Sequence, residues 1–470
     1  MRDVVMNDTF CWGDERVASV HEFVRDRERR GKRMRDGEGQ MQEWAEGVTL
    51  EGLTWGDYVA LDRNAGLVRS TISLAFSADG KLFASTHGDH SVKIFSYPDG
   101  TQMRSLEGHP RTPWTVQFHP QDSTYLASGC LGYECRIWNV ETGACLRKYK
   151  FGASISCVSF HPDGDILAIT SGRKLLFWEF GPLSARQDTL PLEDVHPAAN
   201  PYHMVAFHPS GSYIMTGEKN DASEQGTVEG VQDSQFTLKL EIRRFQRSIA
   251  RLSRTTGPFE LGEIILRVRR AVAYNDAGVH FSPCGRMLVA CIPTPENPMK
   301  YHIAVMSLFA IAPNQPAGTI LFSGPIDQGR VHGLTNLKFS STSSHILAGF
   351  SFRRSNQVIA EIFASAVGNT RPQVRVVDIY SLKKDLNVIH SLTAEVSLEG
   401  VEDEINIAGF APGFGVSDGI VYGTQKGRIR MFHGTSHEAY FMTLAEYCAK
   451  QRSIQASLND QESNRAGRLE

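Results

Sequence analysis

A chain of 470 residues with 41% hydrophobic and 21% charged residues can bury a sizeable core, so disorder over most of its length is excluded. The formal net charge of -3 gives no global positive field, and binding to nucleic acid or to an anionic membrane would need a local basic patch. The length alone does not determine the number of domains, because closed β architectures often form one long domain.

The amino-terminal residues and the cysteines indicate in which cellular compartment the protein is expected. Residues 1–14 mix acidic and polar side chains and lack the apolar run of a signal peptide, so secretion is not expected. The eight cysteines are scattered without a CxxC pair, which favours a reducing compartment, the cytoplasm and also the nucleus. The longest apolar stretch, 304–312, is about half of the roughly 18 residues that a membrane-spanning helix needs. We interpret it as a buried strand and expect no membrane span.

Residues 1–56 are predicted to form a helical amino-terminal extension, with a helix over 12–30. Val17, Val20 and Val24 recur at helical spacing, and Phe23 widens the apolar stripe. This helix either packs on the rest of the fold as a lid or docks a partner. The candidate partner contacts are Trp12, Val17, Val20, Phe23 and Val24. The mixed-charge run 25–35 is interpreted as a solvated linker, with nuclear import or RNA contact as the alternative.

From residue 57 to 434 one pattern recurs: an apolar strand ends in Phe, a turn of the type Ser/His-Pro-x-Gly follows, and a second apolar strand begins. The repeated phenylalanines are Phe76, Phe118, Phe160, Phe207, Phe281, Phe339 and Phe410. The first two intervals are both 42 residues, inside the roughly 40–45 residue period of WD repeats. Third strands such as SVKIFSY and CRIWNVETG follow at the expected distance. The sequence therefore predicts an all-β fold, a single seven-bladed WD40 β-propeller.

The longer intervals in the second half require insertions. Residues 218–235 are rich in polar residues and Gly and are predicted to form a mobile surface loop, after which FTLKLEIRRF resumes strand-like alternation. Closing the ring requires a strand from the other end of the chain, and either 57–62 or 67–70 could complete the blade around Phe410. Residues 435–470 are predicted to form a carboxy-terminal helix and tail, which caps the propeller or binds a partner.

Motifs for catalysis are absent from the sequence. No phosphate-binding loop, HExxH or GxSxG motif occurs at a meaningful place, and we expect a protein without enzyme activity, metal or cofactor. His119, His161 and His208 share one repeat position, where a polar contact within the turn explains them. His109, Ser128 and Trp138 are expected to form a buried hydrogen-bond network that ties the strands of one blade together. The turn 131–134 lacks the Asp that would complete this network, whereas Asp89 supplies a turn acid in the preceding repeat.

Several stretches carry a family resemblance. STISLAFSADGKLFASTHGDHSVKIF, GHPRTPW followed by TVQFHP, and NDAGVHFSPCGRMLVACIP resemble the Ambra family, the activating molecule in beclin-regulated autophagy. The opening CWGDERVASVHEFV resembles the first helical segment of that family. Animal members carry a very long insertion between two half-propellers, where this chain has only the stretch 218–261. The chain also departs from the W-D-x-R blade ending of many WD receptors, with Trp138-Asn139-Val140-Glu141 in its place.

The resemblance implies a substrate receptor of a cullin-four RING E3 ubiquitin ligase that docks to the damage-binding adaptor and regulates autophagy. On this hypothesis the amino-terminal helix contacts the adaptor, and the open face of the propeller takes the substrate or autophagy proteins. The first alternative is a WD40 interaction scaffold in another complex without a ubiquitin link. The second is an RNA-binding or chromatin-binding propeller that uses the basic clusters Arg243-Arg244 and 267–270. We expect protein partners and no small-molecule substrate.

Overall fold

The structure is a computed structural model. It describes residues 46, 50, 58–60, 70–179, 198–220, 237–247, 259–273, 277–293, 301–325, 333–351, 373–378, 388–393, 405–412 and 417–433. The predicted helix 12–30, with Trp12, Val17, Val20, Phe23 and Val24, lies outside these residues. So do the predicted carboxy-terminal helix and tail, 435–470.

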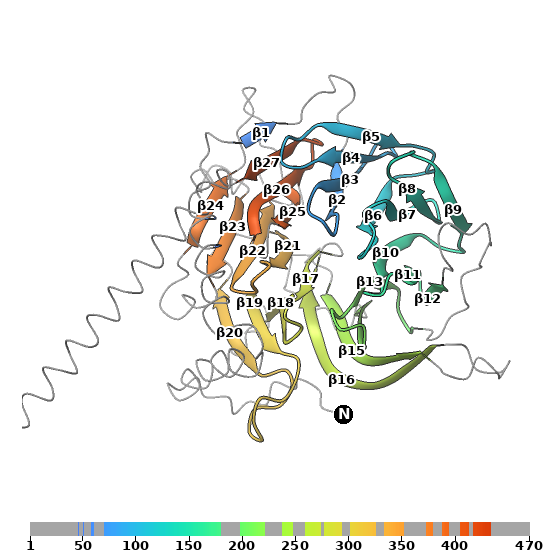
Figure 1. Cartoon of the computed structure of the whole chain (residues 1–470). Helices are drawn as coiled ribbons and strands as arrows, with labels where there is room; N and C mark the ends of the chain where they lie inside the picture. The colour runs from blue at the N-terminus through green and yellow to red at the C-terminus, as the bar shows by residue number, and fades with distance from the viewer. Residues whose placement is uncertain are drawn as a thin grey trace, which may run out of the picture.

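Antiparallel β-sheets arranged around a central axis make up the described fold, which is a WD40 β-propeller (Figure 1). The first sheet contains β2 (Thr71–Phe76), β3 (Leu82–His87), β4 (Val92–Ser96) and β5 (Gln102–Leu106). The second contains β6 (Pro113–Phe118), β7 (Tyr125–Cys130), β8 (Glu134–Asn139) and β9 (Cys145–Lys150). The third contains β10 (Ile155–Phe160), β11 (Ile166–Ser171) and β12 (Lys174–Glu179).

The largest sheet has eight strands, and its two halves are joined by the single pair Val272 and Cys291. Its first half is β13 (Tyr202–Phe207), β14 (Tyr213–Lys219), β15 (Thr237–Arg247) and β16 (Phe259–Val272). Its second half is β17 (Val279–Phe281), β18 (Met287–Pro293), β19 (Tyr301–Ser307) and β20 (Ile320–Pro325). The next sheet is β21 (Gly333–Phe339), β22 (His345–Ser351), β23 (Gln373–Asp378) and β24 (Val388–Thr393).

The last sheet joins the two ends of the chain. It contains β25 (Ile405–Pro412), β26 (Ser417–Thr424), β27 (Ile429–His433) and β1 (Tyr58–Ala60), which pairs with β27 in the register Tyr58 to Phe432. Of the two closing segments left open by the sequence, the first therefore supplies the strand. Figure 1 shows this sheet beside β2, so that the ring closes between the latest and the earliest sheets of the chain.

The repeated phenylalanines occupy equivalent places in the inner strands. Phe76, Phe118, Phe160, Phe207, Phe281 and Phe339 are the last residues of β2, β6, β10, β13, β17 and β21, and Phe410 lies in β25. Phe76 is half-buried, and the other six are buried. Their side chains contribute to the apolar layers between neighbouring sheets, because each sheet of a propeller is covered by the next.

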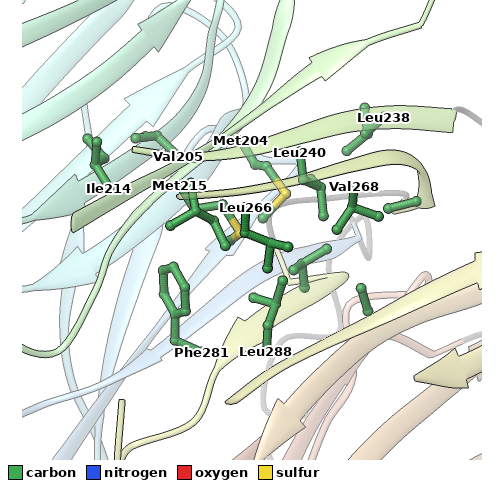
Figure 2. Close-up of a cluster of buried hydrophobic side chains, with 14 of the residues drawn as sticks. Met204, Val205, Ile214, Met215, Leu238, Leu240, Leu266, Val268, Phe281 and Leu288 are labelled. Carbon is green, nitrogen blue, oxygen red and sulfur yellow. The ribbon is translucent and has the colours of Figure 1, made fainter. Parts of the chain in front are cut away.

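The largest such layer lies around β13 to β18. Figure 2 shows Met204 and Val205 from β13 and Leu266 and Val268 from β16 in one buried cluster with Phe281 of β17. The long interval between Phe207 and Phe281 is explained by β15 and β16, which have 11 and 14 residues and form one extended hairpin. At about 0.8 kcal/mol per buried methylene group, this layer is a main source of stability for this part of the ring.

Two predicted boundaries need correction. The predicted loop 218–235 starts too early, because β14 continues to Lys219 and the buried Asn220 donates a side-chain hydrogen bond to the carbonyl of Arg269. The rest of that loop, 221–235, lies outside the described residues. The apolar stretch 304–312 is a buried strand only as far as Ser307. Phe309, beyond the strand, is 38% exposed, since the chain turns there toward β20.

Candidate functional site: contacts between repeats and a partner-binding face

The histidine that follows the repeated Phe connects one repeat to the next. The Nδ1 atom of His161 accepts a hydrogen bond from the backbone N–H of Asp163 in its own turn at 3.2 Å. The proton is therefore on Nε2, which donates to the carbonyl of Gly211 in the next repeat at 3.1 Å. His208 repeats this arrangement, with Nε2 2.6 Å from the carbonyl oxygen of Gly285. The sequence predicted only the contact within the turn.

The same imidazole rings pack on the next repeated Phe. His119, His161 and His208 meet the rings of Phe160, Phe207 and Phe281 edge-on, with centroids 5.3, 5.0 and 5.3 Å apart. Burial lowers the pKa of His208 below its usual range, which keeps the ring neutral. A neutral imidazole supplies one donor and one acceptor, and His161 and His208 use both in these contacts. These histidines therefore hold neighbouring repeats of the propeller together.

Substituting the glycine of such a contact is expected to destabilise the fold. Gly211 has a φ of +71°, and a Cβ added there would lie 2.5 Å from Nε2 of His161. A left-handed backbone costs a non-glycine residue about 1–2 kcal/mol, and the displaced imidazole adds to this. We expect Gly211→Ala to lower the free energy of unfolding in urea by about 2 kcal/mol or more. Gly152→Ala is the control, because nothing lies within 4 Å of its Cβ position. Equal losses for the two variants would contradict the packing described here.

His109, Ser128 and Trp138 form a buried network. The Ser128 hydroxyl oxygen lies 2.7 Å from Nε2 of His109 and accepts a hydrogen bond from the indole N–H of Trp138 at 2.8 Å. All three side chains are buried. In the part of the chain that the structure describes, Nδ1 of His109 has no hydrogen-bond partner, at the place where the turn 131–134 has no Asp. Burial and the neighbouring Arg136 lower the pKa of His109 to about 3. The network is a structural contact between strands.

One group of side chains has the composition of a metal site. His161, Asp163 and Asp165 place their ligand atoms within 4.8 Å of one another. Both nitrogens of His161 are already engaged, however, by the N–H of Asp163 and the carbonyl of Gly211. A metal bound there would break one of these contacts, and Asp163 is exposed. The group is explained by its role in the turn.

The basic clusters proposed for nucleic-acid binding lie opposite each other on β15 and β16. Glu241 accepts hydrogen bonds from Arg243 at 2.7 Å and from Arg267 at 3.0 Å. Partial burial acts to raise the pKa of Glu241, but the hydrogen bond from Arg243 and the charges of Arg243, Lys239 and Arg267 lower it overall. Arg243 and Arg267 are thus neutralised within the hairpin, which weakens the case for a phosphate-binding patch.

An open polar hollow of about 560 Å³ lies over the first sheet. It is lined by Asp89, His90, Ser91, Lys93, Gln102, Ser105, Glu107 and Gly108. In the lining of the hollow, Asp89 accepts hydrogen bonds from the backbone N–H and the hydroxyl of Ser91 at 3.1 and 2.6 Å. Partial burial acts to raise the pKa of Asp89, but these hydrogen bonds outweigh it and the pKa is lowered. The hollow offers charged groups of both signs to a partner, and its lining includes Asp89, the turn acid singled out from the sequence.

Two equivalent turns of the first two sheets carry side chains in a strained conformation, and the first of these turns lines the hollow. His90 in the turn before β4 and Tyr133 in the equivalent turn before β8 have φ values of 72° and 71°, which normally favour glycine. Tyr133 is 43% exposed, although it is a large side chain. An exposed Tyr on a rigid turn suits protein contacts, because its ring is large and its hydroxyl can bond a partner. This face of the first two sheets is the candidate partner-binding face.

Cysteine chemistry does not add a further site. The six cysteines within the described residues are free, and Cys130, Cys135, Cys157 and Cys291 are buried. Burial raises the pKa of the Cys135 and Cys291 thiols far above the usual range, so they stay protonated and unreactive. None of the described helices is long and apolar enough to cross a membrane.

Comparison with known proteins agrees with this fold. The model of the WD domain, G-beta repeat, matches residues 69–96, 100–139 and 143–179. The Activating molecule in BECN1-regulated autophagy protein 1B of Danio rerio is 33% identical over 224 residues, which cover 47% of this chain and 16% of that protein. Protein 1A of the same fish is 33% identical over 156 residues, 33% of this chain and 12% of that protein. Over less than half of its length, the chain is thus similar to WD40 proteins of the Ambra family. It spans about a sixth or less of the length of these two relatives.

Other proteins share the repeat or the fold with this chain. Eukaryotic translation initiation factor 3 subunit I of Aspergillus terreus is 34% identical over 110 residues, which cover 23% of this chain and 32% of that protein. The crystal structure of the β-propeller domain of Cps50 (Swd1) from Myceliophteria thermophila superposes with a TM-score of 0.54 and 16% identity. That alignment covers 80% of this chain and 100% of the solved domain, and it shows the fold alone.

Proposed function

We propose that the chain is a non-catalytic scaffold that acts as a substrate receptor of a cullin-four RING E3 ubiquitin ligase and takes part in autophagy regulation. The observation that carries this proposal is the 33% identity over 224 residues to a protein named for regulated autophagy, together with the WD40 propeller on which that similarity falls. A substrate receptor must bind the adaptor and the substrate at the same time. A propeller is a rigid ring with enough surface for both partners. The cytoplasm, and also the nucleus, are the proposed compartments.

The geometry of the described residues supports binding over catalysis. The polar groups that resemble catalytic or metal sites, His109 with Ser128 and His161 with Asp163, are engaged in contacts that hold the ring together. The open hollow beside Asp89 and the exposed Tyr133 provide a surface for a partner. We place the substrate or autophagy protein on this face.

We propose seven blades for the ring, with the propeller domain at 57–434. The eight-stranded sheet supports this count, because its halves β13–β16 and β17–β20 each begin with a strand that ends in the repeated Phe. Only one residue pair, Val272 with Cys291, joins them. The described residues form six hydrogen-bonded sheets. If the two halves of the eight-stranded sheet are counted as separate blades, the ring has seven blades.

The adaptor contact is proposed to be the helix predicted over 12–30. Val20→Asp with Phe23→Asp is expected to abolish co-purification of the damage-binding adaptor and of the cullin with the full chain. An apolar anchor buried in an interface typically costs about 2 kcal/mol or more when it is lost, which is roughly a thirtyfold loss of affinity. Affinity purification followed by mass spectrometry measures the recovered adaptor and cullin.

Ala18→Asp with Arg25→Gln is the matched control for this experiment. It changes the net charge by the same amount, on the opposite side of the predicted helix. Loss of both partners in the first variant alone supports the proposal. If neither adaptor nor cullin co-purifies with the unmodified chain, the alternative of a WD40 scaffold without a ubiquitin link is favoured.

A further inference from the structure

A buried carboxylate from the amino-terminal segment lies against the turn between β21 and β22. Glu46 is fully buried, and its Oε2 atom accepts hydrogen bonds from the hydroxyls of Thr342 and, at 3.2 Å, of Ser344. Nδ1 of His345 lies 3.3 Å from the same oxygen. These contacts join residues almost 300 positions apart in the sequence.

Leu50 anchors the same segment in the apolar core. It is fully buried in a cluster with Leu347 of β22 and with Phe410 and Phe432 of the last sheet. Two residues of the amino-terminal segment therefore dock on the propeller, one by a carboxylate and one by an apolar side chain. We call this pair, Glu46 and Leu50, the amino-terminal clasp.

The turn that receives Glu46 differs from the equivalent turn of the first repeat. After β2, the turn contains its own acid, Asp79, which accepts hydrogen bonds from Ser77 at 2.7 Å and from Ser123 of the next sheet at 3.0 Å. After β21, residues 340–344 read Ser-Ser-Thr-Ser-Ser and contain no acid. Thr342 stands at the position of Asp79, and Ser343 takes the glycine position with a φ of 66°. Glu46 thus supplies the missing carboxylate from outside the turn.

We propose that Thr342 is a phosphorylation site that controls the amino-terminal clasp. The γ-phosphoryl group of ATP is transferred to Oγ1 of Thr342, the hydroxyl proton leaves to a base of the kinase, and ADP departs. The hydroxyl that donated to Glu46 is then lost, and a group with a charge of about −2 faces the carboxylate. Like-charge repulsion and the loss of the donor act together to expel Glu46.

The exposure of the hydroxyls favours Thr342 over the two serines that follow it. Ser343 and Ser344 are 1% and 2% exposed, whereas Thr342 is only partly buried. Of the residues that bond Glu46, Thr342 is therefore the one that a kinase can reach. Release of the clasp would free the segment that carries the helix predicted over 12–30. That last consequence for the adaptor rests on the proposed function, whereas the release itself does not.

Hydrogen exchange of the full chain tests the release. Phosphothreonine incorporated at position 342 by an expanded genetic code, or Thr342→Asp, is expected to speed amide exchange around Glu46 and Leu50 by about tenfold or more. Exchange in β6–β9 should stay unchanged, which separates release of the clasp from unfolding. Ser210→Asp is the control at the same turn position, where the exposed Ser210 bonds only within its own turn.

A second variant separates the repulsion between the negative charges at positions 46 and 342 from other effects at this turn. Adding Glu46→Gln to Thr342→Asp removes the like charges and is expected to restore slow exchange. Unchanged exchange with phosphothreonine at 342, or no rescue by Glu46→Gln, overturns the proposal that charge controls the clasp. This readout does not involve the adaptor, so its failure is distinguishable from failure of the proposed function.

Mass spectrometry tests the modification itself. Trypsin releases the turn in one peptide, Phe339–Arg353. The full chain purified from eukaryotic cells in the presence of phosphatase inhibitors is expected to carry phosphate on this peptide, at Thr342. A peptide recovered without phosphate, or with phosphate only at another residue, overturns the assignment of the site.

Discussion

Acidification from pH 7 to pH 5 is expected to lower the free energy of unfolding by about 6 kcal/mol through three buried histidines. Burial lowers the pKa of His302 to about 4, burial together with Arg136 lowers that of His109 to about 3, and burial together with Lys338 lowers that of His280 to about 3. All three pKa values lie below the value of about 6.5 in an unfolded chain, so protons bind the unfolded state more tightly. The stability is fully present above pH 6.5 and is lost as the pH falls toward the folded pKa values.

The window between pH 6.5 and pH 5 separates this effect from that of the carboxylates. Asp79, Asp89 and Glu241 also have lowered pKa values, but their stability is lost only below the unfolded values of about 4. Urea unfolding at a series of pH values measures the slope. His302→Leu is expected to remove about a third of it, whereas His90→Gln, on the open hollow, serves as the control. A free energy of unfolding that stays level down to pH 5 would contradict the buried neutral state of these rings.

Phe160→Ala is expected to destabilise the protein by about 3–5 kcal/mol, the usual cost of removing a buried aromatic ring. Phe160 is 4% exposed and packs with Leu167, Ile169 and Trp178. It also meets the ring of His119 edge-on, so its removal loosens a contact between two sheets. Urea unfolding followed by tryptophan fluorescence measures the loss, since Trp178 lies in the same cluster.

Two comparisons sharpen this prediction. Lys174→Ala is the surface control, because Lys174 is exposed at the start of β12. Phe76→Ala should cost less than Phe160→Ala, because Phe76 is only half-buried. Similar losses for Phe160→Ala and Lys174→Ala would mean that the repeated Phe does not belong to the core.

The sequence predicted the strands of the fold because they follow from local periodicity. The repeated phenylalanines end the inner strands, and stretches such as CRIWN and KLLFWE form the third strands β8 and β12. The contacts from His161 to Gly211 and from His208 to Gly285 were missed, since they join residues 50 and 77 positions apart. A signal was present, because each of these histidines is followed one repeat later by a glycine in the turn.

The candidate partner-binding face was only partly predictable. Asp89 was recognised as a turn acid, but nothing in the sequence shows that His90 and Tyr133 adopt positive φ values. Their conformation depends on the hydrogen bonds of the turn, where the N–H of each bonds the carbonyl three residues earlier. Glu46 gave no signal at all, because one Glu in a polar segment has no periodicity and its partners lie in a distant turn.

The pairing of β1 with β27 has a consequence for synthesis on the ribosome. Tyr58–Ala60 leaves the ribosome long before its partner strand Ile429–His433 is made. At about 5–20 residues per second, the first strand waits on the order of tens of seconds without a neighbour. During that time the unfinished ring has exposed edges that other chains can join. The nascent protein is thus expected to need a chaperone until β27 leaves the exit tunnel.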